Sequence, residues 1–349
     1  MPNRRSIVFA LAAAVLFGVS TPAAKFLVAQ TDPWLTAGLL YLGSGTGLGI
    51  AWLLRRGLSR TKEAPLRPSD LPWLAAAIAS GGVVAPVLLM FGLARAPAVQ
   101  ASLLLNLEGV LTAVLAWVVF REHFDRRIAI GMGLITIGAF ALAWQPAGRL
   151  GVEPAALLIV AACLGWAIDN NLTRKVSGGD PVLIAAVKGG AAGTVNLGIA
   201  LASTVRLPDA GSIFGASLVG FFGYGVSLVF FVRALRDLGA ARTGAYFSTA
   251  PFLGAVASIV ALSEPFTLRL AIAGVLMALG VWLHISEAHD HEHTHEELQH
   301  EHLHRHDEHH AHAHAPEAPT DEPHSHLHTH APLLHAHPHY PDLHHRHEH

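Results

Sequence analysis

Two stretches of this sequence decide its fold, because they repeat one another. Residues 98–138 read AVQASLLLNLEGVLTAVLAWVVFREHFDRRIAIGMGLITIG, and residues 240–280 read AARTGAYFSTAPFLGAVASIVALSEPFTLRLAIAGVLMALG. Adding 142 to each number of the first stretch aligns it with the second without a gap and pairs Glu122 with Glu264. We therefore interpret the chain as two copies of one unit.

Each copy is built from apolar stretches long enough to cross a bilayer. Hydrophobic residues make up 52% of the 349 residues and charged residues only 14%, and the mean hydropathy is +0.42. A membrane-spanning helix needs about 20 apolar residues. Such stretches occur at about 6–26, 34–54, 71–93, 97–120, 128–145, 154–173, 181–203, 212–235, 241–262 and 268–286. We predict an all-α integral membrane protein with ten transmembrane helices, five in residues 1–145 and five in residues 146–286.

The number of helices in each copy fixes how the copies are related. Five is odd, so the second copy must cross the membrane in the opposite sense to the first. Inverted repeats of helices interrupted by glycine and proline are the architecture of secondary transporters that work by alternating access. Lys and Arg gather in the connections on the side of the N-terminus, such as Arg55 and Arg126, whereas Arg95 and Arg269 lie opposite. The positive-inside rule then places both termini in the cytosol.

A family resemblance rests on short motifs that occur once in each copy. These motifs are Leu16-Phe17-Gly18, Gly165-Trp166-Ala167, Phe120-Arg121-Glu122-His123-Phe124 and Leu262-Ser263-Glu264-Pro265-Phe266. Over residues 6–286 the chain resembles the EamA-type ten-helix carriers of the drug/metabolite transporter superfamily. The resemblance implies export or exchange of small organic solutes across the bacterial inner membrane. The chain departs from the family pattern in its first copy, which has no proline at Asn106-Leu107-Glu108 where the second copy has Pro251.

Four ionisable residues lie within the predicted spans: Lys25, Glu108, Asp169 and Lys188. Each costs about 2.5 to 3.5 kcal/mol at a helix centre, so they must pair with one another or face a cavity. Two acids and two bases permit pairing of Lys188 with either carboxylate. We interpret Glu108 as a gating or coupling carboxylate whose protonation drives the conformational switch. The alternative for Glu108 is a static salt bridge.

Further polar residues next to these four complete the candidate substrate site. We expect Asp169 and Asn170 to hydrogen-bond substrate, with Trp166 on the same helix face as Asn170. Asn106 precedes Glu108, and Lys188 suits an anionic substrate group. Two alternatives stay open: the span ends early and is merely capped by these residues, or Lys188 is a structural counter-ion.

Three other residues receive structural interpretations. Glu122 and Glu264 lie at predicted helix starts, where a carboxylate caps free amide groups. Lys25 is expected to extend its ammonium group to the outer interface. Cys163 is the single cysteine, so it forms no intramolecular disulfide, and its apolar surroundings predict simple packing.

Residues 287–349 form a third region that is rich in His, Asp, Glu and Pro. This composition cannot build a core, so we expect a disordered cytosolic tail. Imidazoles bind Zn, Ni, Co or Cu. The candidate metal ligands in its two densest blocks are His289, His291, His293, His295, His324, His326, His328 and His330. The tail is interpreted as a metal sensor or buffer, as a pH-responsive segment, or as a passive extension.

Composition also excludes some classes of function. A formal net charge of −2 provides no basic field for nucleic acid, and the spans contain no Ser/His/Asp or Cys/His constellation of an enzyme. The expected partners are the lipid bilayer and a small polar metabolite.

The rival cargo is a divalent metal ion, and its oxygen ligands would come from Glu108, Asp169, Asn106 and Asn170. Lys188 argues against a metal cargo, because a fixed cation repels a metal ion. A membrane metal sensor that transports nothing is a further alternative. We expect no required cofactor. The sequence leaves open whether the protein is a monomer or a homodimer.

Overall fold

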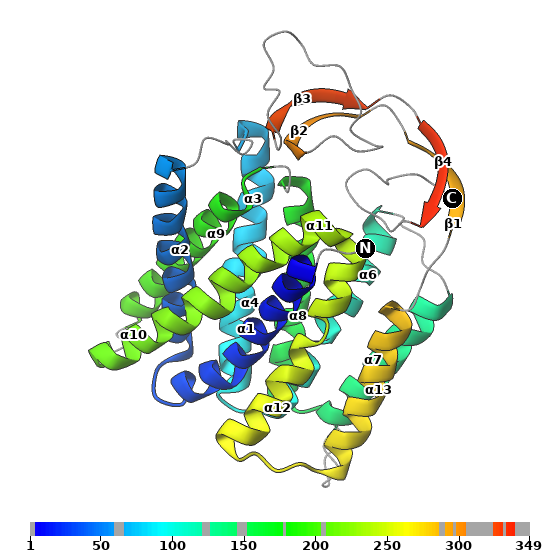
Figure 1. The fold of residues 1–349 in the computed structure, drawn as a ribbon. Coiled ribbons are helices and arrows are strands. Elements are labelled where there is room, and N and C mark those ends of the chain that lie inside the picture. The colour runs from blue at the N-terminus through cyan, green and yellow to red at the C-terminus, as the bar shows by residue number, and fades with distance from the viewer. Residues whose placement is uncertain are drawn as a thin grey trace.

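The computed structural model describes a bundle of helices and, after it, short strands (Figure 1). The described residues are 4–58, 66–120, 126–144, 152–176, 179–203, 207–285, 290–295, 298–304, 324–330 and 333–338. The helices of the first repeat are α1 (Arg4–Val28), α2 (Pro33–Leu58), η1 (Pro68–Asp70), α3 (Leu71–Ala77), η2 (Ile78–Val84), α4 (Ala85–Leu93), α5 (Ala98–Leu104), α6 (Leu107–Phe120) and α7 (Arg126–Ala143). Those of the second are α8 (Pro154–Thr173), η3 (Arg174–Val176), α9 (Pro181–Ala202), α10 (Ala210–Val219), η4 (Gly220–Val226), α11 (Ser227–Phe247), α12 (Ala250–Leu262) and α13 (Leu268–Ile285).

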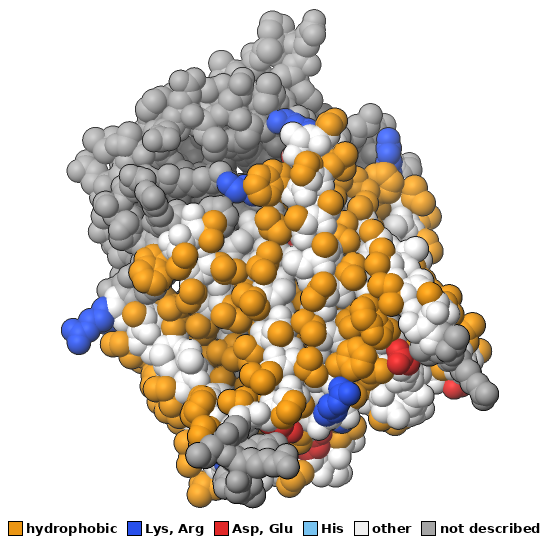
Figure 2. Space-filling view, turned by 180° about the vertical axis from the view of Figure 1, so that it is seen from behind, with side chains coloured by type: hydrophobic (Ala, Val, Ile, Leu, Met, Phe, Trp, Pro, Cys, Tyr) orange, Lys and Arg blue, Asp and Glu red, His pale blue; other side chains and the backbone are white. Residues whose placement is uncertain are grey.

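The prediction of an all-α membrane protein is confirmed. In the described part of the chain, eight helical segments are long and apolar enough to cross a membrane, and the shorter apolar helices Ala250–Leu262 and Leu268–Leu283 follow them. Hydrophobic side chains are spread over the whole described part of the face seen in Figure 2, with few charged groups among them. Such a surface suits contact with lipid rather than with water.

Aspartates at helix starts explain why several helices begin where they do. The Asp32 carboxylate accepts a hydrogen bond from the Trp34 amide at 2.8 Å, and Pro33 occupies the first turn of α2. The Asp180 carboxylate likewise accepts a hydrogen bond from the Val182 amide at 2.9 Å, and Pro181 is the first residue of α9. An acidic cap followed by proline is a strong helix start.

The two repeats are interlocked rather than set side by side. α2 packs along α9, and α7 packs along α13, so equivalent helices of the two repeats pair with each other. The first helix of each repeat lies on the other repeat: α1 contacts α11 and α12, and α8 contacts α4 and α6. The bundle has two ends. The Glu264 end contains the connections at residues 29–32, 94–97, 207–209 and 263–267, and the Asp180 end is opposite.

Glycines allow the close contact between α2 and α9. A Cβ atom on Gly189 would lie 2.7 Å from the Gly45 amide nitrogen, and one on Gly38 would lie 2.7 Å from the Leu197 amide nitrogen. A Cβ atom on Gly193 would overlap the Leu42 backbone. Small residues at such crossings let the helix backbones approach each other inside a membrane.

A π-helical segment recurs at the same place in both repeats. η2 begins at Ile78 and η4 at Gly220, an offset of 220 − 78 = 142 residues, which is the offset of the sequence repeat. The wide turn of a π-helix leaves carbonyl groups that side chains must satisfy. In η2 the Asn196 amide lies 3.3 Å from the Gly82 carbonyl oxygen and 3.4 Å from that of Val83.

Two predicted spans differ from the structure in their continuity. The span predicted at 97–120 is broken between α5 and α6, where Leu105 and Asn106 form a turn. The connection expected between 235 and 241 is helical, because α11 continues to Phe247. Pro97 marks the equivalent connection in the first repeat, whereas Gly239 occupies this place in the second. Without proline, the helical hydrogen bonds have no obligatory interruption.

The tail contains strands where we expected no regular structure. They are β1 (Asp290–His295), β2 (Leu298–His304), β3 (His324–His330) and β4 (Leu333–Pro338), and they pair antiparallel as β1 with β4 and β2 with β3. Alternating sequence has the period of a strand, which explains the pairing. A two-stranded sheet is only marginally stable by itself in water.

Candidate functional site

The predicted polar residues meet where helices of the two repeats face each other. Glu108 lies in the first turn of α6, in the first repeat. Asp169 and Asn170 lie in the last part of α8, and Lys188 lies two turns into α9, both in the second repeat. Because α8 continues to Thr173, its span does not end before these residues.

Asp169 takes Lys188 as its ion-pair partner. The Lys188 Nζ lies 2.5 Å from Asp169 Oδ1, and their side chains are only 15% and 10% exposed. Thr173 completes a triangle, since its hydroxyl donates to Asp169 Oδ1 at 2.7 Å and lies 2.9 Å from Lys188 Nζ. The structure thus resolves the pairing that the sequence left open, and Lys188 is occupied rather than free for an anionic ligand.

Glu108 has an amide rather than a cation as its partner. The Asn170 side chain donates to Glu108 Oε1 at 2.9 Å and lies 3.5 Å from the Thr112 hydroxyl. Asn170 is exposed and Glu108 is half-buried, so a ligand reaches this pair more easily than the Asp169 pair. The Asn171 side-chain amide donates to the Ala167 carbonyl oxygen at 2.9 Å and to the Thr112 carbonyl oxygen at 3.3 Å.

Trp166 binds the π-helical segment of the first repeat. Its indole Nε1 donates to the Gly81 carbonyl oxygen at 2.9 Å, and the Tyr41 hydroxyl donates to the same oxygen at 3.0 Å. A Cβ atom on Gly81 would lie 2.4 Å or less from Asp169 side-chain atoms, so glycine is required there. Tyr41 also contacts Tyr224 of η4, with ring centroids 5.5 Å apart. Aromatic groups therefore connect η2, α8 and η4.

Asn106 lies apart from this group. Its amide donates to the Leu103 carbonyl oxygen at 2.9 Å and faces Met277 Sδ at 3.9 Å. It thus stabilises the turn between α5 and α6 rather than joining Glu108.

The glutamates of the repeated motif have different outcomes. Glu264 caps free amides as predicted, but those of α5 rather than of its own following helix: it accepts from Ala98 and Val99, each at 2.7 Å. Glu122 lies outside the described residues. Lys25 donates to the Leu93 and Ala96 carbonyl oxygens at 2.6 and 3.0 Å, at the end of α4.

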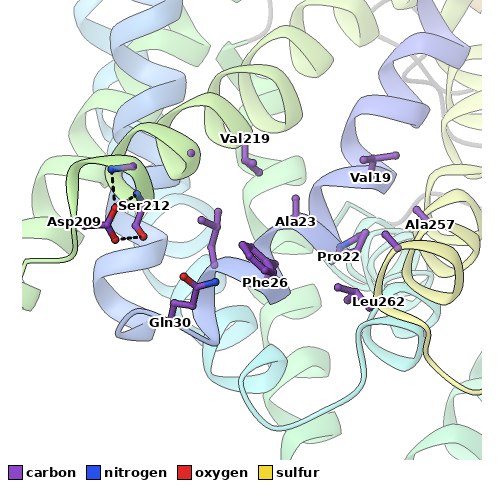
Figure 3. A pocket seen from close by; sticks show the side chains of 14 residues that line it. Val19, Pro22, Ala23, Phe26, Gln30, Asp209, Ser212, Val219, Ala257 and Leu262 are labelled. Atoms are coloured by element: carbon purple, nitrogen blue, oxygen red, sulfur yellow. Dashed lines mark hydrogen bonds between the residues drawn. The ribbon is translucent and has the colours of Figure 1, made fainter.

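A separate crevice of about 630 Å³ lies between α1, α10 and α12 (Figure 3). Its walls are mostly apolar, for example Phe26, Val219 and Ala257, and its polar groups come from Gln30, Asp209 and Ser212. Hydrogen bonds from the Ser212 side chain and backbone hold the pKa of the Asp209 carboxyl below its usual value. None of the residues predicted for the substrate site lines this crevice.

The structure leaves the predicted metal ligands of the tail untested. Within the parts of the chain that the structure describes, no three His, Cys, Asp or Glu side chains gather as a metal site requires. His289 lies outside those parts, whereas His291 and His326 are in β1 and β3. In backbone register His302 is opposite His326, and His291 is opposite His337.

Comparison with known proteins identifies the family of this architecture. The model of the EamA-like transporter family matches twice, over residues 4–144 and 153–286. The chain belongs to the EamA-like transporter family. An uncharacterized transporter of Methanothermobacter thermautotrophicus is 28% identical over 290 residues, which cover 78% of this chain and 84% of that protein.

Two further comparisons give lower sequence identity over a similar share of the chain. The uncharacterized transporter YyaM of Bacillus subtilis is 22% identical over 291 residues, which cover 80% of this chain and 93% of YyaM. A solved crystal structure with 19% identity has a TM-score of 0.59 and covers 80% of this chain and 95% of its own. That likeness shows the fold alone. The family match and the apolar helices make this EamA-like chain a multi-pass membrane transporter.

Sequence reasoning missed some members of the site. Tyr41 carries no charge and stands among apolar residues, so no pattern singled it out. Gly81 contributes a carbonyl group, which every residue has. The available signal was the pair Gly81-Gly82 in the middle of a span, because glycines that interrupt a transporter helix indicate a binding region.

Proposed function

We propose that this chain is a secondary transporter that exports or exchanges a small polar metabolite across the bacterial inner membrane by alternating access. The observation that carries the proposal is the contact between Glu108 of the first repeat and Asn170 of the second. Ionisable groups inside a membrane bundle mark substrate or ion pathways. A polar contact between two inverted repeats is where a site alternately open to either side belongs.

The two carboxylates of the site have different tasks in this proposal. Asp169 is neutralised by Lys188 and Thr173 and holds α8 against α9. Glu108 has no cation among its described contacts, so its charge is balanced either by a proton or by a cationic group of the substrate. Replacement of the proton on Glu108 by the cationic group of the substrate, and the reverse, couples solute movement to proton movement.

Substrate binding breaks few contacts in this arrangement. The Asn170 amide needs only to rotate away from Glu108 Oε1 to release both groups toward a ligand, since Asn170 is exposed. Trp166 offers less, because its indole nitrogen is already bound to the Gly81 carbonyl oxygen. We expect Glu108 and Asn170 to contact substrate directly and Trp166 to fix the position of α8 against η2.

The proposal is tested with purified full-length protein in proteoliposomes. Labelled amino acids, nucleosides, organic acids and divalent metals are supplied one at a time, and two fluxes are measured: exchange of labelled for unlabelled solute, and uphill movement driven by a pH gradient. We expect an organic solute to show both fluxes. Glu108→Gln, which stays neutral, should lose the gradient-driven flux, because that flux needs protonation to change, and should also weaken exchange, because glutamine offers no charge to a cationic group of the substrate.

Asp70→Asn is the matched control. Asp70 caps η1 by accepting from the Arg67 amide at 2.9 Å, far along the chain from the site, so this variant should keep both fluxes. Gradient-driven flux that survives Glu108→Gln would disprove the coupling role. Movement of a metal alone, or of no solute in any class, would overturn the proposed function.

A further inference from the structure

The Glu264 end of the bundle is tightly closed above the candidate site. Helix α5 lies there, and its Ser102 side chain is 0% exposed. A Cβ atom on Gly254 of α12 would lie 2.9 Å from Ser102 Oγ and 2.8 Å from the Gly18 carbonyl oxygen of α1. The three helices α1, α5 and α12 thus meet through small residues with no room between them.

Glu264 holds this closed arrangement from the second repeat. Its two carboxylate oxygens accept one hydrogen bond each from the Ala98 and Val99 amides, both at 2.7 Å. Pro97 precedes α5 and provides no side-chain cap, so the first amides of α5 depend on Glu264. Hydrogen bonds between a carboxylate and backbone amides are stronger than neutral ones.

Lys25 holds the other side of the same turn. Its ammonium group donates to the carbonyl oxygen of Leu93, the last residue of α4, and to that of Ala96, within the turn at residues 94–97. The carbonyl groups of the turn therefore face a cation from α1, and the amide groups that follow it face an anion from the connection between α12 and α13. This polarity matches the macrodipoles of α4 and α5.

The connection that carries Glu264 has features of a movable segment. Among the described residues, Ser263 is the only one other than glycine with a positive φ, at 53°. Backbone in this region concentrates at clamps and switches. Ala257 and Ala261, nearer the end of α12 than Gly254, line the crevice of Figure 3, so this end of α12 borders open space.

We propose that Glu264 and Lys25 form the gate at this end of the transporter, which opens when Glu264 leaves the amides of α5. The inference rests on the proposed alternating access. It assigns the repeated glutamate motif a role in the transport cycle beyond that of a helix cap. In the closed state, the two side chains fix α5 against α1 and α12; in the open state, α12 shifts toward the crevice and Ser102 becomes accessible.

A cysteine at position 102 tests the gate without any substrate. Cys163 is the single native cysteine and is buried, so it gives little background. Ser102 Oγ has no hydrogen-bond partner, so Ser102→Cys removes no bond. The rate of alkylation by a membrane-impermeant maleimide is measured in right-side-out and inside-out vesicles. Glu264→Gln in the Ser102→Cys background should raise the rate about tenfold from one side only, because charge-assisted hydrogen bonds are lost from the closed state.

Glu153→Gln is the matched control at the same end. Glu153 accepts a hydrogen bond from the side-chain amide of Gln100 in α5 at 3.1 Å, but it binds no backbone amide at the start of that helix. The alkylation rate of the Glu153→Gln variant should therefore stay unchanged. Lys25→Met tests the same gate and should also raise the rate, which keeps the test available if Glu264→Gln fails to fold.

Two results would overturn the gate. One is an unchanged alkylation rate in a folded Glu264→Gln protein. The other is equal labelling of Cys163, which would show general unfolding and leave Glu264 a structural cap. Because alkylation needs no solute, one-sided opening without any solute flux would retain the gate and reject only the proposed function.

Discussion

Replacing Lys188 by Met should destabilise the protein by about 3 kcal/mol, because it leaves the Asp169 carboxylate charged and without a cation inside the bundle. Asp169 would keep the Thr173 hydroxyl at 2.7 Å, which places the loss at the lower end of the range for broken buried pairs. Asp169→Asn should cost less, about 2 kcal/mol, because the long Lys188 side chain keeps Thr173 and reaches toward polar surroundings. The double variant, with no lone charge, should also cost about 2 kcal/mol.

These values predict a coupling energy of about 3 kcal/mol in the double-mutant cycle. The assay is thermal unfolding in detergent with a thiol-reactive fluorogenic dye, which reaches the buried Cys163 only when the protein unfolds. Lys188→Met should lower the midpoint by roughly 6 °C at a fixed scan rate. Arg95→Met is the control, because Arg95 is exposed and lies over the Phe91 ring, a contact worth about 1 kcal/mol or less. Additive effects of the two single variants would refute the ion pair as the reason for stability.

Three further predictions concern packing, backbone strain and the tail. Gly193→Leu should abolish folded protein in a size-exclusion assay because the new side chain would overlap Leu42, and normal folding of this variant would contradict the α2–α9 contact. Gly198 has open space around it, so Gly198→Ala should leave stability unchanged or raise it by up to about 1 kcal/mol. Ser263→Val should lower stability by roughly 1 to 2 kcal/mol because of its positive φ, and Ser263→Gly should not, so equal midpoints for the two variants would refute the strain. Loss of residues 287–349 should remove Zn and Ni binding in calorimetry while leaving the unfolding midpoint of the bundle unchanged, and binding by the full chain should weaken below about pH 6.5 as imidazoles gain protons; retained binding would place the metal site elsewhere.

The fold was largely predictable because membrane helices must be long and apolar and because the repeat preserves register. Residues 98–138 and 240–280 carry that information directly. The irregular backbone was not predictable. The turn after Leu105 and the π-helical start at Ile78 depend on carbonyl groups that distant side chains satisfy, such as the Asn196 amide. Hydropathy does not record such partners.

The charged members of the candidate site were predictable, but their pairing was not, and the sequence did not indicate Tyr41 or the Gly81 carbonyl group. Charges inside spans are rare, so Asp169 and Lys188 stood out, but the partner of each depends on the rotation of α8 and α9. Glu264 was predictable as an amide cap, because its position at a helix boundary is visible in the sequence. That it caps a helix of the other repeat was not, because this follows only from how the repeats interlock.

The exchange of first helices between the repeats has a consequence for biosynthesis. α1 leaves the ribosome first, but its partners α11 and α12 are among the last spans to be made. Until those spans are inserted, the polar groups of α1, such as Ser20, lie in the bilayer without their final neighbours. Completion of the bundle is therefore a late event that follows insertion of the second repeat. Two half-chains divided near residue 150 should each remain incomplete alone and assemble only when made together in one membrane.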